Sequence, residues 1–350
     1  MKNSRVQVLN HQTNKLNLLT AVSCLVVVLA AGLGRASAAE FDARACFTAS
    51  TAAASPAAAI NIGRVAPFRI YGAAQYETAG AALRNRRTAA IELSGVIAPV
   101  QEAWIYWAVI TTGAPPAAAT RIQVQRLSPP APASANVTLN GAVVGVGPQP
   151  CEWTGTQITV YRAQIPAAVA TGNGTYKLTL LNGAGGLIDG ENPWAAPQVS
   201  PMWEGASIVM IGTGIQQVAF YDAGLAGNTF NADTGLAYQL VLPERGAAAN
   251  TEVYFDEIGA DGQHGLGRIA NAAVSSETTT VEGLAVAGPG SPYNDNDWNG
   301  STGLVLPELW DDAGHRLIIP NNTNLLRVGI NNGAFGFGDC LTPVANVVAF

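Results

Sequence analysis

The sequence predicts an all-β protein, built as an antiparallel β-sandwich of jelly-roll or immunoglobulin-like type. Short runs rich in β-branched and aromatic residues recur along the chain and are separated by turn residues. The 38 glycines and 20 prolines are spread throughout, which leaves little room for long helices. The runs expected as strands include 104–110, 157–162, 176–181, 207–211, 217–221 and 325–330.

Two of the strand regions carry further information. The run 104–110 is apolar on both faces, as is typical of a strand that is buried inside a sandwich. The segment 137–144 contains Asn140-Gly141 between two apolar runs. Because Asn-Gly readily supplies the two positive φ angles of a type I′ turn, this segment predicts a β-hairpin.

Residues 1–38 have the features of an export signal. Three basic residues accompany an apolar stretch at 16–32, and Ala36-Ser37-Ala38 provides the small-x-small pattern that signal peptidase needs. We expect cleavage after Ala38 or Ala39, giving a secreted protein, extracellular or at the cell surface, that is no longer an integral membrane protein. An uncleaved anchor is the alternative, but it would need about 20 apolar residues and no cleavage site.

The charge of the chain argues against nucleic acid as a partner. The full sequence has 18 Lys+Arg and 24 Asp+Glu, a net charge of −6. The leader holds four of the basic residues and none of the acidic ones, so the cleaved form has 14 against 24, or −10. An acidic protein without basic runs is poorly suited to neutralise phosphates.

The length after cleavage suggests more than one module. The 312 residues that follow position 38 exceed a usual single domain. The Ala-rich segment 39–62 is expected to be a weakly ordered lead-in. We expect a first β-sandwich module at 63–215 and a second at 216–350, with one large sandwich as the alternative.

Three cysteines remain after cleavage: Cys46, Cys151 and Cys340. In an oxidising compartment, one disulfide with one cysteine left over is the expected arrangement. Cys151 and Cys340 both lie in segments marked by Gly or Pro, and they are our predicted pair. None of the three has a close Cys or His neighbour, so a zinc site has no support.

The densest polar segment, 294–301, resembles the first half of a calcium loop. Asp295, Asp297 and Asn299 alternate before Gly300, so their oxygens could point toward one ion while the glycine permits a sharp turn. The closing glutamate of such a loop would fall at Leu306. Calcium held by these three residues is therefore one hypothesis, and a solvated turn of Asp and Asn is the other.

A second polar segment offers candidate ligand-binding residues: Asp256, Asp261 and His264. Asp256 and Asp261 across a turn could form the carboxylate pair of a glycosidase, although a polar loop flanked by glycines is the simpler reading. Trp298 and Trp310 lie near polar turns, where an exposed ring could stack on a sugar. Such rings also often fill the ends of a sandwich core. No Gly-x-Ser-x-Gly nucleophile elbow is present.

Several short motifs together resemble a loosely characterised group of secreted bacterial β-sandwich, adhesin-like surface proteins. They lie at 103–107, 137–141, 150–153, 161–163, 172–176, 204–207, 309–312 and 338–341. The resemblance implies this location and fold, no established catalytic residues, and a disulfide between Cys151 and Cys340. The chain departs from the group at Glu152, and at 163–165, where an acidic residue is usual.

These observations favour a secreted or cell-surface structural or adhesive protein without catalytic activity. Its expected partners are glycans or other surface proteins, and calcium is the one cofactor that the sequence suggests. The alternative is a secreted glycan-binding or glycan-cleaving protein that uses the acidic and tryptophan-bearing loops.

Overall fold

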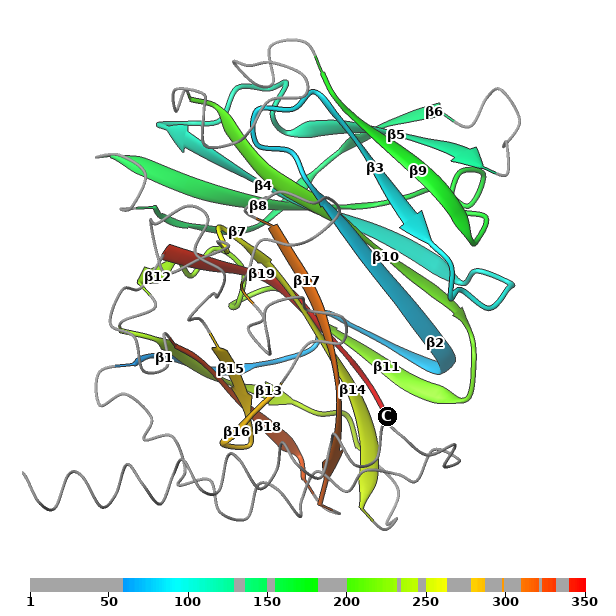
Figure 1. Ribbon diagram of the computed structural model, residues 1–350, viewed down its shortest axis with the longest axis vertical. Helices are drawn as coiled ribbons and strands as arrows, with labels where there is room; N and C mark the ends of the chain where they lie inside the picture. Colours follow the sequence, from blue (N-terminus) through cyan, green and yellow to red (C-terminus); the bar gives the residue numbers. More distant parts are fainter. Residues whose placement is uncertain are drawn as a thin grey trace, which may run out of the picture. The chain divides into compact units, whose positions relative to one another are not determined.

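Strands are the only regular elements among the residues that the computed structural model describes (Figure 1). These residues are 59–128, 136–149, 155–181, 200–231, 234–244, 250–262, 278–286, 298, 310–320, 323–331 and 340–350. All of them belong to one unit, Ala54–Phe350. The strands form packed sheets that are almost entirely antiparallel, which confirms the predicted all-β sandwich class. In this part of the chain, no helix is long and apolar enough to cross a bilayer.

The strands are arranged in three sheets. The largest has the order β17 (Trp310–Ile319), β14 (Thr251–Ala260), β19 (Cys340–Ala349), β11 (Gln216–Tyr221), β2 (Arg69–Ala82), β10 (Met202–Thr213), β4 (Glu102–Thr112), β8 (Thr156–Gln164) and β7 (Ala142–Pro148), and β12 (Phe230–Asn231) pairs with β19. The second has the order β1 (Ile60–Val65), β13 (Leu236–Val241), β18 (Leu325–Asn331), β15 (Thr278–Val281) and β16 (Leu284–Ala285). The third has the order β3 (Thr88–Leu93), β9 (Gly174–Leu180), β5 (Arg121–Ser128) and β6 (Asn136–Asn140).

The largest sheet curls so that one part of it packs against another. Strands β17 and β14 contact β10, and β17 also contacts β2, although these strands are far apart in the order of the sheet. A hydrogen bond crosses this contact from Trp310 Nε1 to Ser207 Oγ, at 3.0 Å. The curl therefore encloses a core made from a single sheet.

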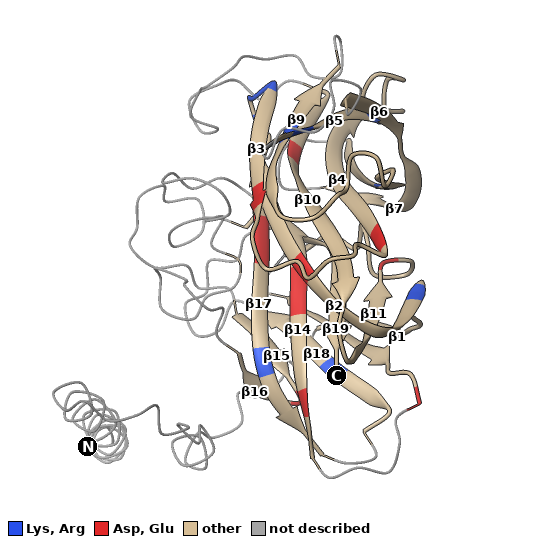
Figure 2. Cartoon of the chain, turned by 90° about the vertical axis from the view of Figure 1, so that its right-hand side faces the viewer, with Lys and Arg blue, Asp and Glu red and all other residues tan. Residues whose placement is uncertain are grey.

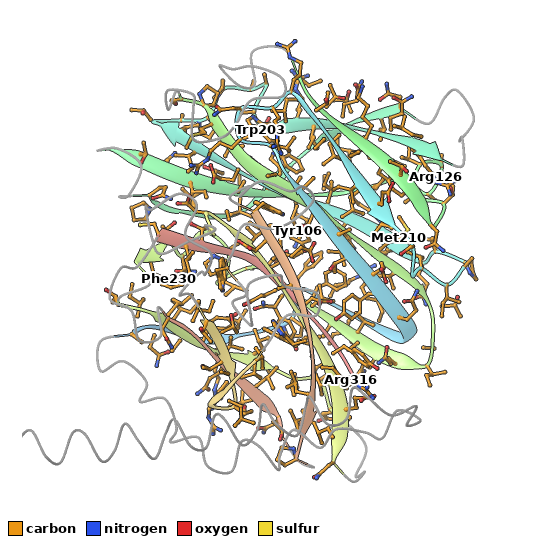
Figure 3. The ribbon with its side chains drawn as sticks, in the orientation of Figure 1. Tyr106, Arg126, Trp203, Met210, Phe230 and Arg316 are labelled. Carbon is orange, nitrogen blue, oxygen red and sulfur yellow. The ribbon has the colours of Figure 1, made fainter. Side chains whose placement is uncertain are left out.

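Three apolar cores result, and Figure 3 labels residues from each of them. Core 1 lies between the four-stranded sheet and the outer face of β2, β10, β4 and β8, and contains Trp203 and Met210. Core 2 is the inside of the curl and contains Tyr106. Core 3 lies between the five-stranded sheet and the outer face of β11, β14 and β19, and contains Phe230.

Strand β4 shows why the run 104–110 is apolar on both faces. Trp107 and Val109 point into core 1, whereas Tyr106 and Ala108 point into core 2. Alternating residues of a strand face opposite sides of the sheet, so a strand between two cores must be apolar throughout. The rings of Trp107 and Trp203 stack with their centroids 6.2 Å apart.

The predicted hairpin at Asn140-Gly141 is wrong. Strand β6 pairs with β5 in the four-stranded sheet, while β7 pairs with β8 in the largest sheet. Neither Asn140 nor Gly141 has a positive φ angle, as a type I′ turn would require. Glycine is needed here for space instead, because a Cβ atom on Gly141 would lie 2.6 Å from the Trp107 ring.

The predicted boundary at residue 215 falls between β10 and β11, two strands of the same sheet. Core 1 uses residues 81–210, and core 3, apart from Val65, uses residues 219–348. Strand β2, however, pairs with β10 on one side and with β11 on the other. The largest sheet thus joins both ranges, and the division into two modules stays a prediction.

Candidate functional site

Asp256 lies close to two further carboxylates and a tyrosine. Gly314 on β17 is the register partner of Asp256 on β14. Asp312 lies two residues before Gly314 on β17, so its side chain projects from the same face of the sheet as that of Asp256. Tyr76 on β2 hydrogen-bonds to the Asp256 carboxyl group, and the charge on Glu77 reaches both aspartates. We call Tyr76, Glu77, Asp256 and Asp312 the acidic cluster. As whole residues the four are half-buried, and Oδ2 of Asp312 is buried.

Small side chains around the acidic cluster make room for its carboxyl groups. A Cβ atom on Gly314 would lie 2.1 Å from Oδ1 of Asp256, so a larger residue here would require this carboxyl group to shift. Thr78 Oγ1 donates a hydrogen bond to Asp312 Oδ1 at 2.5 Å, and the Ser207 hydroxyl also hydrogen-bonds this carboxylate. The cluster is therefore built on three strands, β2, β14 and β17, and is contacted from a fourth, β10.

The environment separates the acidities of the two aspartates. The pKa of Asp256 is raised to about 8: burial raises it most, the hydrogen bond from Tyr76 lowers it, and the neighbouring carboxylates raise it. Burial raises the pKa of Asp312 to about 6, against the hydrogen bonds that it accepts. Burial also raises the pKa of Glu77. The pKa of Asp256 is thus raised further than that of Asp312, which places a weaker carboxylic acid beside a stronger one.

Sequence reasoning points to Asp256 but misses Asp312 and Tyr76. Alternation within a strand shows which residues share a face, but it does not show which strands become neighbours. The sequence offers one signal for Asp312: two acidic residues, Asp311 and Asp312, directly follow Trp310, which packs in core 2.

Asp261 belongs to a different and almost completely buried network. Arg84 Nη2 donates to Glu204 Oε2 at 2.6 Å and to Asp261 Oδ1 at 2.9 Å. Arg84 Nε donates to Glu204 Oε1 at 3.1 Å, which makes this contact bidentate. Gln149 Nε2 donates to Asp261 Oδ2 at 2.7 Å. Asp261 therefore serves an internal ion network with Arg84, whereas Asp256 belongs to the acidic cluster.

Glu257 faces the opposite side of β14 from Asp256 and lies in core 3. It accepts a hydrogen bond from Thr279 Oγ1, and its Oε1 lies 4.0 Å from His315 Nε2. The His315 ring stacks on Phe255 with the centroids 5.8 Å apart. Burial raises the pKa of Glu257 to about 8. Both members of this pair are buried, so the pair faces the interior of the protein.

Trp298 and Trp310 are both buried, with exposed fractions of 1% and 0%. Trp298 packs in core 3 and donates from Nε1 to Thr279 Oγ1 at 3.2 Å. Trp310 packs in core 2. Neither ring has an exposed face on which a sugar could stack, and both are core residues.

Other predicted residues lie outside the described part of the chain: the leader 1–38, Cys46, Cys151, His264, Asp295, Asp297 and Asn299. Cys340, at the start of β19, is completely buried and disulfide-bonded. Its partner is not among the described residues, so the pairing with Cys151 stays a prediction. Within the described ranges, no group of three or more His, Cys, Asp or Glu residues is arranged to hold a metal ion.

Two edge strands without charged residues meet at the corner formed by Gly141. Strand β6 is an edge of the four-stranded sheet and β7 is an edge of the largest sheet, with no described strand on their outer sides. No charged residue occurs between positions 136 and 148, and both strands are uncoloured in Figure 2. On β7, Val143 and Val146 are 57% and 54% exposed. We call β6 and β7 together the uncharged edge.

Comparisons with known proteins give only distant likenesses. No family model matches the chain, and no curated protein matches it. Among solved structures, the ANX2 ectodomain from Arabidopsis thaliana is similar with a TM-score of 0.25 and 6% identity, over 79% of this chain and 82% of that one. N-glycanase F (PNGase F) is similar with a TM-score of 0.20 and 9% identity, over 78% of this chain and 95% of that one. Both likenesses are too distant to carry a conclusion about this chain.

Proposed function

We propose that this chain is a secreted or cell-surface β-sandwich protein with a structural or adhesive role and no catalytic activity. The observation that carries the proposal is the uncharged edge. Soluble proteins protect the edges of their sheets with lysines, prolines, bulges or covering loops, because an open edge pairs with other strands. Here β7 has no lysine and exposes Val143 and Val146, and its protection is confined to Pro148 at its end and an irregular pairing with β8 between Val143 and Gly145.

The partners that fit this edge are other surface proteins that can contribute an extended segment. Such a segment would pair with the backbone of β7 and place its side chains beside Val143 and Val146. Glycans remain a proposed partner on the basis of the polar loops of the sequence.

Three further properties belong to the same proposal. The leader 1–38 would be removed on export, and the oxidising compartment would then support a disulfide between Cys151 and Cys340. The burial of Cys340 and its disulfide-bonded state are consistent with such a bridge. Calcium would bind at Asp295, Asp297 and Asn299, and the support for this is the spacing of these residues alone.

The adhesive role predicts that lysine on β7 weakens association. Beads coated with the purified protein should clump, and beads coated with the Val143→Lys, Val146→Lys variant should clump at least about tenfold less. Burying two unpaired charges in a strand-paired contact costs more than about 1.4 kcal/mol, the equivalent of tenfold in affinity. Clumping is measured by light scattering at physiological ionic strength.

The matched control is Ile215→Lys, because Ile215 is 100% exposed in the turn between β10 and β11 and is not part of the uncharged edge. This variant should clump like the parent protein. Equal loss in both variants, or no clumping by the parent, would refute adhesion through β7.

Glycan cleavage is a second candidate function, and the acidic cluster is the observation that favours it. A neighbouring acid and base with separated acidities are what a glycosidase requires. The leading proposal expects no release of reducing sugar from a panel of polysaccharides. If sugar is released, and if Asp256→Asn and Asp312→Asn abolish the release while Glu257→Gln does not, glycan cleavage replaces the structural role.

A further inference from the structure

The four-stranded sheet of β3, β9, β5 and β6 has one apolar and one polar face (Figure 1). Residues alternate along its strands, and those on the apolar face pack in core 1. Those on the other face are all half-buried or exposed: Thr88, Ala90 and Glu92 on β3, Thr175, Lys177 and Thr179 on β9, Arg121, Gln123 and Gln125 on β5, and Asn136, Thr138 and Asn140 on β6. We call this set the polar face.

The side chains of the polar face have no partners within the part of the chain that the structure describes. No side-chain hydrogen bond or ion pair joins Lys177, Arg121 or any other of them to a described residue. By contrast, the exposed Arg316 on β17 forms an ion pair with Glu252 on β14. The hydroxyl, amide and basic groups of the polar face are therefore available to a ligand.

The charge of this part of the chain is opposite in sign to that of the whole. The full sequence has a net charge of −6, but residues 103–188 include four basic residues and one acidic residue. On the polar face, Lys177 and Arg121 are basic and Glu92 is the one acidic residue. Figure 2 shows acidic colour along β14 and β17 instead. The polar face thus attracts anions, although the protein as a whole is acidic.

The two basic residues lie at the ends of a row of amides. Lys177 is the register partner of Gln125 on β5. Gln123 and Arg121 follow on the same face of β5, because every second residue of a strand faces the same side. With a rise of about 3.4 Å per residue, the Cα atoms of Gln125 and Arg121 lie about 14 Å apart. An extended polymer along β5 would meet a cation, two amides and a second cation.

The chemistry of the polar face selects among classes of partner. It carries no aromatic ring, on which the apolar side of a sugar or an unpaired base could stack. It also carries no large apolar side chain of the kind that anchors a protein partner. Its amides and hydroxyls suit sugar hydroxyls, and its Lys and Arg suit carboxylate or sulfate groups. A polysaccharide with such acidic groups is the partner that fits.

We propose that the polar face binds an acidic polysaccharide. Lys177 and Arg121 bind its carboxylate or sulfate groups, while Gln123 and Gln125 bind its hydroxyls. One copy of the protein offers only these two cations, so a long polymer binds best when it engages many copies at once. The inference rests on the surface location and the glycan partner of the proposed function, and it names the class of glycan. It does not depend on β7.

Binding of the purified protein to immobilised polymers tests the proposal. The probes are dextran sulfate and polygalacturonate, which distinguish sulfate from carboxylate, and neutral dextran. The parent should bind at least one of the acidic polymers about tenfold more tightly than dextran. Raising the salt concentration from about 0.1 M to about 0.5 M should weaken this binding several-fold, because it screens the attraction. Arg121→Gln with Lys177→Gln should weaken it about tenfold.

Two further variants separate loss of binding from loss of the fold. Arg64→Gln removes another exposed cation that has no partner among the described residues, but this cation lies on β1. It should bind like the parent. Glu92→Gln removes the acidic residue of the polar face and should strengthen binding several-fold. A variant that had merely lost its fold would not gain affinity in this way.

Several outcomes would overturn the polar face as the site. They are equally tight binding to dextran, equal loss in Arg64→Gln and in the double variant, and no effect of Glu92→Gln. Absence of binding to both acidic polymers, with intact bead clumping, would overturn this inference alone. Binding that the double variant loses, without bead clumping by the parent, would overturn adhesion through β7 alone.

Discussion

Replacing Arg84 by alanine is expected to destabilise the protein by roughly 3–5 kcal/mol, the usual cost of removing one partner from a buried ion network. Arg84 makes hydrogen bonds to both Glu204 and Asp261, and all three side chains are almost fully buried. Without the guanidinium, two buried carboxylates lose the positive charge that both of them contact. Urea denaturation at pH 7 measures the loss in the free energy of unfolding.

Two comparisons separate charge from packing. Arg327→Ala removes an exposed ion pair with Glu282 and should cost far less. Changing the whole network to Arg84→Met, Glu204→Gln and Asp261→Asn removes every charge, and should recover much of the stability that Arg84→Ala loses. If Arg84→Ala costs no more than Arg327→Ala, the network does not stabilise the fold.

The free energy of unfolding is expected to fall as the pH rises from about 4 to about 8. Burial raises the pKa of Asp256 and of Glu257 to about 8, and that of Asp312 to about 6. In the unfolded chain these groups titrate near their ordinary values, about 4. The folded protein therefore binds more protons than the unfolded chain in this range, and the slope of stability against pH is negative.

The size and window of this effect differ between the groups. Each contributes at most about 1.4 kcal/mol per pH unit while it is protonated only in the folded state. Asp256→Asn should flatten the curve from about pH 4 to 8 and should make the variant more stable than the parent at pH 8 to 9. Asp312→Asn should flatten it only from about pH 4 to 6.

Urea denaturation at pH 4.5 to 9 (approximate limits of the window) gives these curves. A parent protein whose stability is constant or rises across the window would show that the acidic cluster and Glu257 are ionised in the folded state. An identical curve for Asp256→Asn and the parent would exclude Asp256 as a source of the slope.

The sequence predicts the strands of this fold well, for a reason visible in β4 and β8. Their runs 104–110 and 157–162 fall within the observed strands 102–112 and 156–164. Both strands lie between two cores, so burial itself selects the apolar and β-branched residues that make a strand recognisable.

The order of the strands is a different matter. Asn140-Gly141 has the local chemistry of a hairpin, yet the flanking strands enter two different sheets. At this corner Gly141 lies against the Trp107 ring, a contact between residues distant in sequence that the local motif does not reveal. The acidic cluster has the same origin, because Thr78 and Asp312 meet across 234 positions of the chain. Local propensity carries no information about such pairs.

The position of β19 has a consequence for how the chain acquires its structure. β19, residues 340–349, lies between β14 and β11 in the interior of the largest sheet. A polypeptide that emerges from a ribosome or a membrane pore with its N-terminus first must therefore leave one edge of β11 and one edge of β14 without a partner strand until residues 340–349 arrive. Folding that waits for such distant segments is slow, and open strands in the meantime are prone to aggregate. Chaperones that hold the nascent polypeptide would act during this interval, before β19 closes the sheet.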